Sequence, residues 1–163
     1  MVALATVEKY NTLTNQWSSV SSMTTKRSGH ASVTCGDSIY SIGGHDGSQY
    51  LNSVERYDVQ TDQWISISPM KRARIGYAAV SIGESIFVLG GYGNVRLKSV
   101  EMYDTRSNKW MEITPINTTR RYLAAAICDN SIFAIGGKEN RFDSSALKTV
   151  EKLVVLNTNV SKE

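Results

Sequence analysis

The sequence predicts an all-β fold in which equivalent four-stranded units follow one another along the chain. Two observations carry this prediction. The same set of residues recurs with a period of 46 to 50 residues, and each period contains short strand-like segments bounded by Gly or polar turns. Self-similarity at this period indicates a repeat architecture, and four antiparallel strands per repeat are typical of a β-propeller blade.

Four kinds of mark define the repeat. A Val-Glu dipeptide begins ten residues before each Trp, an Arg follows that Trp by ten residues, and a Gly-Gly pair begins sixteen residues after the Arg. The marks are Val7-Glu8, Val54-Glu55, Val100-Glu101 and Val150-Glu151; Trp17, Trp64 and Trp110; Arg27, Arg74 and Arg120; and Gly43-Gly44, Gly90-Gly91 and Gly136-Gly137. Only the segment from Gly-Gly to the next Val varies, with nine, eight and twelve residues. Because surface loops absorb insertions and packed scaffolds do not, these segments are predicted to be loops on one face.

Each complete unit is predicted to contain four strands. The first resembles His30–Cys35, and the second is an apolar run such as 86–89 that ends in Gly-Gly, which is typical of a buried strand. The third, as in Ser53–Asp58, alternates apolar with charged residues, and the fourth begins at the Trp. The predicted units span 1–23 (third and fourth strands only), 24–70, 71–117 and 118–163 (without its fourth strand), which gives thirteen strands or about three and a half blades.

These residues resemble the kelch family. The resemblance rests on the Gly-Gly pairs, on Val-Glu-Arg-Tyr-Asp at 54–58 with its echoes, on the Trp seven residues beyond that Tyr, and on Ser-Pro-Met at 68–70. It covers essentially the whole chain, although Leu153 and Val160 stand where other units have Tyr and Trp. The resemblance implies kelch-type β-propeller blades of four antiparallel strands in an incomplete propeller.

The repeated residues have structural interpretations. We expect the Trp and Tyr side chains to fill the wedge between adjacent blades. The repeated Arg could form an ion pair with the repeated Glu or contact a ligand, and both interpretations remain open. Cys35 and Cys128 occupy equivalent repeat positions and are predicted to be buried thiols rather than a disulfide or metal pair.

Three and a half blades are fewer than the four to eight of closed propellers. The interpretation that we favour is a fragment of a longer kelch protein. A chain that pairs with a second copy and a curved open array are the alternatives, and exposed apolar faces at the two ends would favour association. The strand at 17–20 could also exchange into the last unit and close a distorted ring.

Positive charge is concentrated in two sets of segments, which the resemblance places on one face. They are the variable loops 45–53, 92–99 and 138–149 and the incoming connections 21–27, 68–74 and 114–121, together called the loop face. The loop face holds twelve of the eighteen Lys and Arg residues but only three of the fifteen Asp and Glu residues, a formal charge of +9. The remainder carries −6, so the overall charge of +3 conceals a strong asymmetry.

Arginines interleaved with aromatic side chains suit an acidic peptide segment, because Arg pairs with carboxylates in a bidentate way and aromatic rings supply rigid contact area. The predicted partner-binding residues are Arg27, Arg72, Arg74, Arg96, Arg120, Arg121, Arg141, His45, Tyr50, Tyr92, Asn94 and Phe142. Nucleic acid is not the expected partner, since the basic residues would ring a propeller mouth instead of forming a continuous stripe.

The sequence predicts neither an enzyme nor a cofactor or metal site. His30 and His45 are the two histidines, no His clusters with carboxylates at ligand spacing, and each Gly-Gly ends a strand instead of cradling a phosphate. No apolar stretch is long enough to cross a membrane, and residues 2–5 are too short for a signal-peptide core. We therefore expect no membrane association and a cytoplasmic location.

The resemblance implies a protein-protein interaction module. Kelch-like propellers often form the substrate-recognition half of adaptors for cullin-type ubiquitin ligases, in which a separate BTB domain contacts the ligase. Nothing in this chain could take the BTB role, so that function would need further sequence or a partner chain. The alternatives are an actin or cytoskeletal scaffold and a fragment without function of its own. Recognition should depend on single residues such as Arg72, Arg96 or Arg141, whereas scaffolding should spread over several blades.

Overall fold

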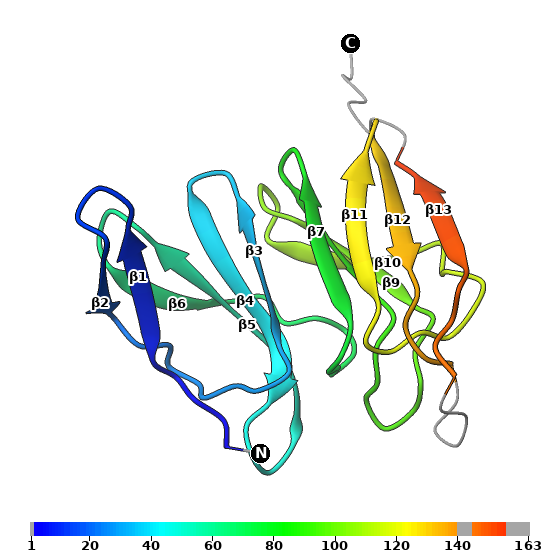
Figure 1. The fold of residues 1–163 in the computed structure, drawn as a ribbon, viewed down its shortest axis with the longest axis horizontal. Coiled ribbons are helices and arrows are strands. Elements are labelled where there is room, and N and C mark those ends of the chain that lie inside the picture. Colours follow the sequence, from blue (N-terminus) through cyan, green and yellow to red (C-terminus); the bar gives the residue numbers. More distant parts are fainter. Residues whose placement is uncertain (1, 140–144, 156–163) are drawn as a thin grey trace.

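The computed structural model describes residues 2–139 and 145–155. These residues form thirteen β-strands and contain no helix. The strands make four antiparallel sheets, which stand in chain order along the long axis of the molecule without closing into a ring (Figure 1). The predicted all-β architecture is therefore confirmed, and the exact division into units stays a prediction.

Within each sheet, the strands pair with their neighbours in the chain. The first sheet contains β1 (Val7–Asn11) and β2 (Gln16–Val20). The second contains β3 (Ala31–Cys35), β4 (Ser38–His45), β5 (Tyr50–Asp58) and β6 (Gln63–Ile67), and the third contains β7 (Ala78–Ile82), β8 (Ser85–Leu89), β9 (Val100–Asp104) and β10 (Lys109–Ile113). The fourth contains β11 (Ala124–Cys128), β12 (Ser131–Ile135) and β13 (Val150–Val154). The segment 156–163, where a further strand would begin, lies outside the described residues.

Strand β8 shows why its sequence is apolar without alternation. Ile86 and Val88 belong to one buried cluster, which also contains Tyr40 and Ile42 of β4. Phe87 and Leu89 belong to a second cluster, which also contains residues of β11–β13 and their connections. Because successive side chains of a strand point to opposite faces, the third sheet is covered on both sides. The hydrophobic core is thus divided between the faces of neighbouring sheets.

The repeated tryptophans join each sheet to the connection before it. The indole Nε1 of Trp64 donates a hydrogen bond to the Ser21 carbonyl (2.9 Å), and Trp110 donates to the Ser68 carbonyl (2.8 Å). The expectation that Trp fills the wedge between blades is correct at these two positions. It is wrong for Trp17, whose side chain is 66% exposed because no sheet covers that side of β2 in the structure.

One alternative and one expectation about the ends of the chain do not agree with the structure. Strand β2 pairs with β1, and the first and fourth sheets lie at opposite ends of the row, so the strand at 17–20 does not exchange into the last unit (Figure 1). Cys35 is buried between the second and third sheets, but Cys128 is exposed because no further described sheet covers β11 on that side. Both thiols are free.

Candidate functional site

The three repeated arginines form the framework beneath the loop face. The Arg27 guanidinium pairs with Glu55 (2.8 Å), Arg74 with Glu101 (2.5 Å) and Arg120 with Glu151 (3.0 Å). All three arginine side chains are almost completely buried. The ion-pair interpretation of these positions is therefore the one that the structure supports, and Arg27, Arg74 and Arg120 are left out of the binding surface described below.

Each arginine also fixes both ends of a variable loop. Nη1 of Arg27 donates to the carbonyl of Gly43, where the first loop departs, and to the carbonyl of Ser53, where it returns (2.8 and 2.9 Å). Arg74 makes the same contacts with Gly90 and Ser99 (2.9 and 3.2 Å). The framework thus holds the base of each loop at a constant geometry, which explains why length variation is confined to the loop itself.

The paired glutamates bind the incoming connections as well. Glu55 accepts hydrogen bonds from the backbone N–H groups of Thr24 and Thr25 (2.6 and 3.0 Å). Burial raises the pKa of Glu55, but the hydrogen bonds from Arg27 and Thr24 and the Arg27 charge outweigh burial, so the pKa lies below its usual value. Glu55 is therefore a charged, structural residue at neutral pH.

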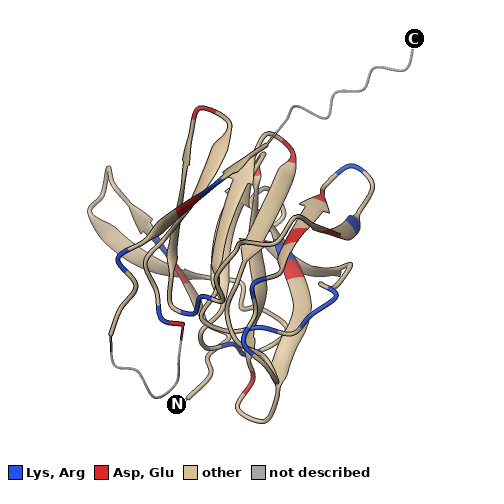
Figure 2. Ribbon diagram, turned by 90° about the vertical axis from the view of Figure 1, so that its right-hand side faces the viewer, with Lys and Arg blue, Asp and Glu red and all other residues tan. Residues whose placement is uncertain are grey.

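Backbone pairing brings the incoming connections and the variable loops together. Ser28 pairs with His45, Ile75 with Tyr92 and Arg121 with Lys138, one such bridge in each of the last three sheets. In Figure 1 these segments lie at the lower ends of the sheets, opposite the hairpins that join β3 to β4, β7 to β8 and β11 to β12. The described parts of the two sets of segments thus occupy one face, as the resemblance implied. In Figure 2 many of the Lys and Arg positions follow the loops in the lower half of the molecule.

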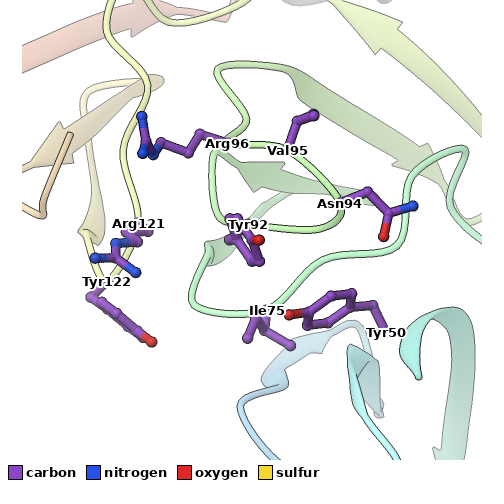
Figure 3. A pocket seen from close by; sticks show the side chains of 8 residues that line it. All are labelled: Tyr50, Ile75, Tyr92, Asn94, Val95, Arg96, Arg121 and Tyr122. Carbon is purple, nitrogen blue, oxygen red and sulfur yellow. The ribbon is translucent and has the colours of Figure 1, made fainter. Parts of the chain in front are cut away.

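A pocket of about 530 Å³ opens on this face. Its lining comes from three sheets: Tyr50 from the second, Ile75 and the loop 92–96 from the third, and Arg121 and Tyr122 from the start of the fourth (Figure 3). The lining comprises Tyr50, Ile75, Tyr92, Asn94, Val95, Arg96, Arg121 and Tyr122. None of these described residues is acidic, so the pocket combines positive charge with aromatic surface.

The aromatic side of the pocket is held in place by ring contacts and by a tight loop. The rings of Tyr50 and Tyr92 meet edge to face with centroids 5.6 Å apart, and the His45 ring also packs against Tyr50, with centroids 5.2 Å apart. The loop after Tyr92 is closed by a backbone bridge from Tyr92 to Arg96. Asn94 and Val95 are therefore presented at the tip of a short, internally bonded loop.

A second pocket adjoins the first and shares Tyr50, Asn94 and Val95 with it. It adds Lys71 and Arg72 from the incoming connection of the third sheet, and its described lining also contains no acidic residue. The Arg72 side chain is 48% exposed and lies 3.5 Å from Glu112. Asn94 and Val95 at the loop tip thus line both pockets, with Arg96 and Arg121 in the first pocket and Arg72 in the second.

The sequence prediction missed three residues of this pocket, Ile75, Val95 and Tyr122, and Tyr122 is the aromatic one among them. It stands at the repeat position of Gly29 and Gly76, and all three residues have a left-handed backbone, with φ of 61°, 58° and 55° in chain order. That conformation costs a residue with a side chain about 1–2 kcal/mol, whereas glycine adopts it freely. An alignment of the three repeats would have revealed this substitution, because Tyr122 stands at a position that is Gly in the other two units.

The remaining predicted residues have different outcomes. His45 is half-buried behind Tyr50, where its Nδ1 accepts a hydrogen bond from the Gly47 N–H (2.9 Å), and it does not line either pocket. Arg141 and Phe142 lie outside the described residues. In the described ranges, no group of three or more His, Cys, Asp or Glu could hold a metal ion. No helix there is long and apolar enough to cross a bilayer.

Comparison with known proteins identifies the repeat. A family model described as the KLHDC2/KLHL20/DRC7 Kelch-repeats domain matches residues 3–160. The chain belongs to the kelch-repeat family. It is also 40% identical over 47 residues to human Kelch-like protein 5, a match that covers 29% of this chain and 6% of that protein. Kelch repeats form protein-interaction modules.

Proposed function

We propose that this kelch-repeat chain binds an acidic segment of a partner protein in the recess formed by the two pockets of the loop face. The observation that carries the proposal is the lining of the two pockets, which together contain four cationic side chains and three tyrosines and no acidic residue among the described members. Guanidinium groups pair with carboxylates through two parallel hydrogen bonds, and tyrosine rings add contact area at a small cost in conformational entropy.

A displayed library of random short peptides tests this proposal directly. Selection on the chain should enrich peptides that contain Asp and Glu. Replacing Arg96 by Ala should weaken binding of an enriched peptide at least about tenfold, as expected for an interfacial anchor. Arg106→Ala is the matched control, because Arg106 is an exposed arginine that pairs with Glu84 on hairpins away from the loop face. Enrichment without acidic residues, or equal losses in both variants, would contradict the proposal.

The adaptor role is a finer part of the same proposal. It is supported by the resemblance of the repeats to the kelch propellers of cullin-type ligase adaptors, and it requires a BTB domain from further sequence or a partner chain. The test is a fusion of the chain to a BTB domain, expressed with a reporter that carries an enriched acidic peptide. Ubiquitination of the reporter should depend on Arg96. Ubiquitination that is unchanged in the Arg96→Ala variant would refute the adaptor role.

Self-association is a separate proposal. Apolar side chains are exposed on both end sheets, among them Trp17 (66% exposed) and Val154 (56%). A second copy could cover these faces and close the row of sheets into a complete propeller. Light scattering during size-exclusion chromatography should then give the mass of a dimer, and a monomer at every concentration tested would contradict it. A cytoplasmic location is proposed as well, and cell fractionation tests it.

A further inference from the structure

We propose that the ring of Tyr122 binds an apolar or aromatic side chain that lies next to the acidic group in the partner segment. This inference rests on the proposed function, because it assigns the ligand chemistry of the same recess. On this inference, the partner segment is recognised by an apolar or aromatic residue as well as by its acidic residues. The argument depends on the backbone at Tyr122, the position of its ring and the arrangement of the groups around it.

The backbone position of Tyr122 belongs to the inner framework of the repeat. The Tyr122 N–H donates to the Gly76 carbonyl (2.6 Å), and the Gly76 N–H donates to the Gly29 carbonyl (3.3 Å). These bonds link the same position of three successive sheets, and the residue at each position has a left-handed backbone. Glycine adopts that conformation freely in two units, and the third carries a tyrosine at a conformational cost.

The ring of Tyr122 recovers little of that cost through burial. The residue is 64% exposed, and the ring lies across Gly76 at the edge of the pocket. The ring also lies near Arg121, whose guanidinium carbon is 5.5 Å from the ring centroid. A strained backbone that presents an exposed aromatic side chain to a recess is typical of a functional position rather than of a packing position.

The neighbouring groups define the ligand. Val95, which is 61% exposed, and Tyr92 line the same pocket as the Tyr122 ring, and Arg96 and Arg121 border it (Figure 3). A partner side chain in this space would meet apolar and aromatic surface, while a carboxylate next to it would lie within reach of a guanidinium. The geometry therefore fits a segment in which an acidic residue adjoins an apolar or aromatic residue.

The experiment compares displayed random-peptide selections on the parent chain and on Tyr122→Gly. The parent should enrich peptides in which Asp or Glu adjoins an apolar or aromatic residue. The variant should keep the acidic preference and lose the apolar one, and it should bind a parent-selected peptide at least about tenfold more weakly. Tyr122→Phe, which keeps the ring, should restore the apolar preference. Asn130→Gly is the matched control, since Asn130 is also left-handed but lies in the hairpin at the opposite end of the fourth sheet.

A stability measurement separates binding from folding. Because Gly adopts the left-handed conformation without strain, the denaturation midpoint of Tyr122→Gly should be no lower than that of the parent. A lower midpoint together with weaker binding would overturn the inference and assign Tyr122 a structural role. An unchanged apolar preference in the variant, or acidic enrichment without an apolar preference in the parent, would also overturn it and leave the proposed function standing. No acidic enrichment on the parent would refute the proposed function itself.

Discussion

The buried pair of Arg74 and Glu101 should be worth far more to stability than the exposed pair beside it. Both side chains of the pair are fully buried, and Glu101 also accepts hydrogen bonds from the backbone N–H groups of Lys71 and Arg72 (2.7 and 3.2 Å). Glu101→Gln keeps the shape of the side chain but leaves the guanidinium without its counter-charge. Loss of one partner of a buried pair costs about 3–5 kcal/mol.

Glu112→Gln is a closely matched control for this change. Glu112 lies directly opposite Glu101 on the neighbouring strand, and its pair with Arg72 is exposed and 3.5 Å long. An exposed pair of this kind contributes about 0–1 kcal/mol. The same chemical change is therefore made at two adjacent positions that differ mainly in burial.

Urea denaturation followed by tryptophan fluorescence measures both variants, because Trp110 is buried in the same sheet. With a slope of about 2 kcal/mol per molar urea, the midpoint of Glu101→Gln should fall by about 2 M, while Glu112→Gln should move by less than about 0.5 M. Arg74→Lys is a milder second variant, since Lys keeps the charge but cannot bridge Gly90, Ser99 and Glu101 together. Equal midpoints for the two glutamine variants would refute the reasoning.

Two further predictions concern pH and the tryptophans. The folded pKa of Glu55 lies below its ordinary value of 4.5, so the charged form stabilises the fold above the unfolded pKa, and this stabilisation should be lost as the pH falls through the folded pKa. The urea midpoint should therefore drop in acid more steeply for the parent than for Glu55→Gln, and identical pH profiles would contradict this. Trp64→Phe removes the hydrogen bond to Ser21, so the free energy of unfolding should fall by about 0.5–1.5 kcal/mol. Trp17→Phe, at an exposed position, should change the denaturation midpoint little. The reverse order in thermal or urea melts would contradict the role of Trp64 in packing between neighbouring sheets.

The repeat made most of the fold predictable from the sequence. Strand positions followed from periodicity, because an apolar run such as 86–89 is buried on both faces and its unit recurs with constant spacing. The errors fell at the ends of the row. Trp17 and Cys128 occupy the same repeat positions as Trp64, Trp110 and Cys35, which are buried or half-buried. Burial at these positions depends on a neighbouring sheet, and the local sequence does not show whether such a sheet is present.

The candidate site was predictable in part. Charge counting found the loop face, and Tyr50, Tyr92, Asn94, Arg96 and Arg121 do line one pocket. Counting could not separate Arg74 from Arg72, since the two are close in sequence and differ only in which side chain faces a buried glutamate. Tyr122 was missed because its importance depends on its left-handed backbone at a position that is glycine in the other units, and charge counting does not detect backbone conformation.

Amide hydrogen exchange, measured with and without a peptide enriched from the library, would locate the binding surface most directly. If the loop face is the recognition surface, exchange should slow in the loops 45–53 and 92–99 and around Arg121 and Tyr122, and the hairpins at the opposite ends of the sheets should be unaffected. Slowing at those hairpins or along the outer strands β6 and β10, with unchanged exchange in the loops, would contradict the account and favour a scaffold that binds through its outer surface.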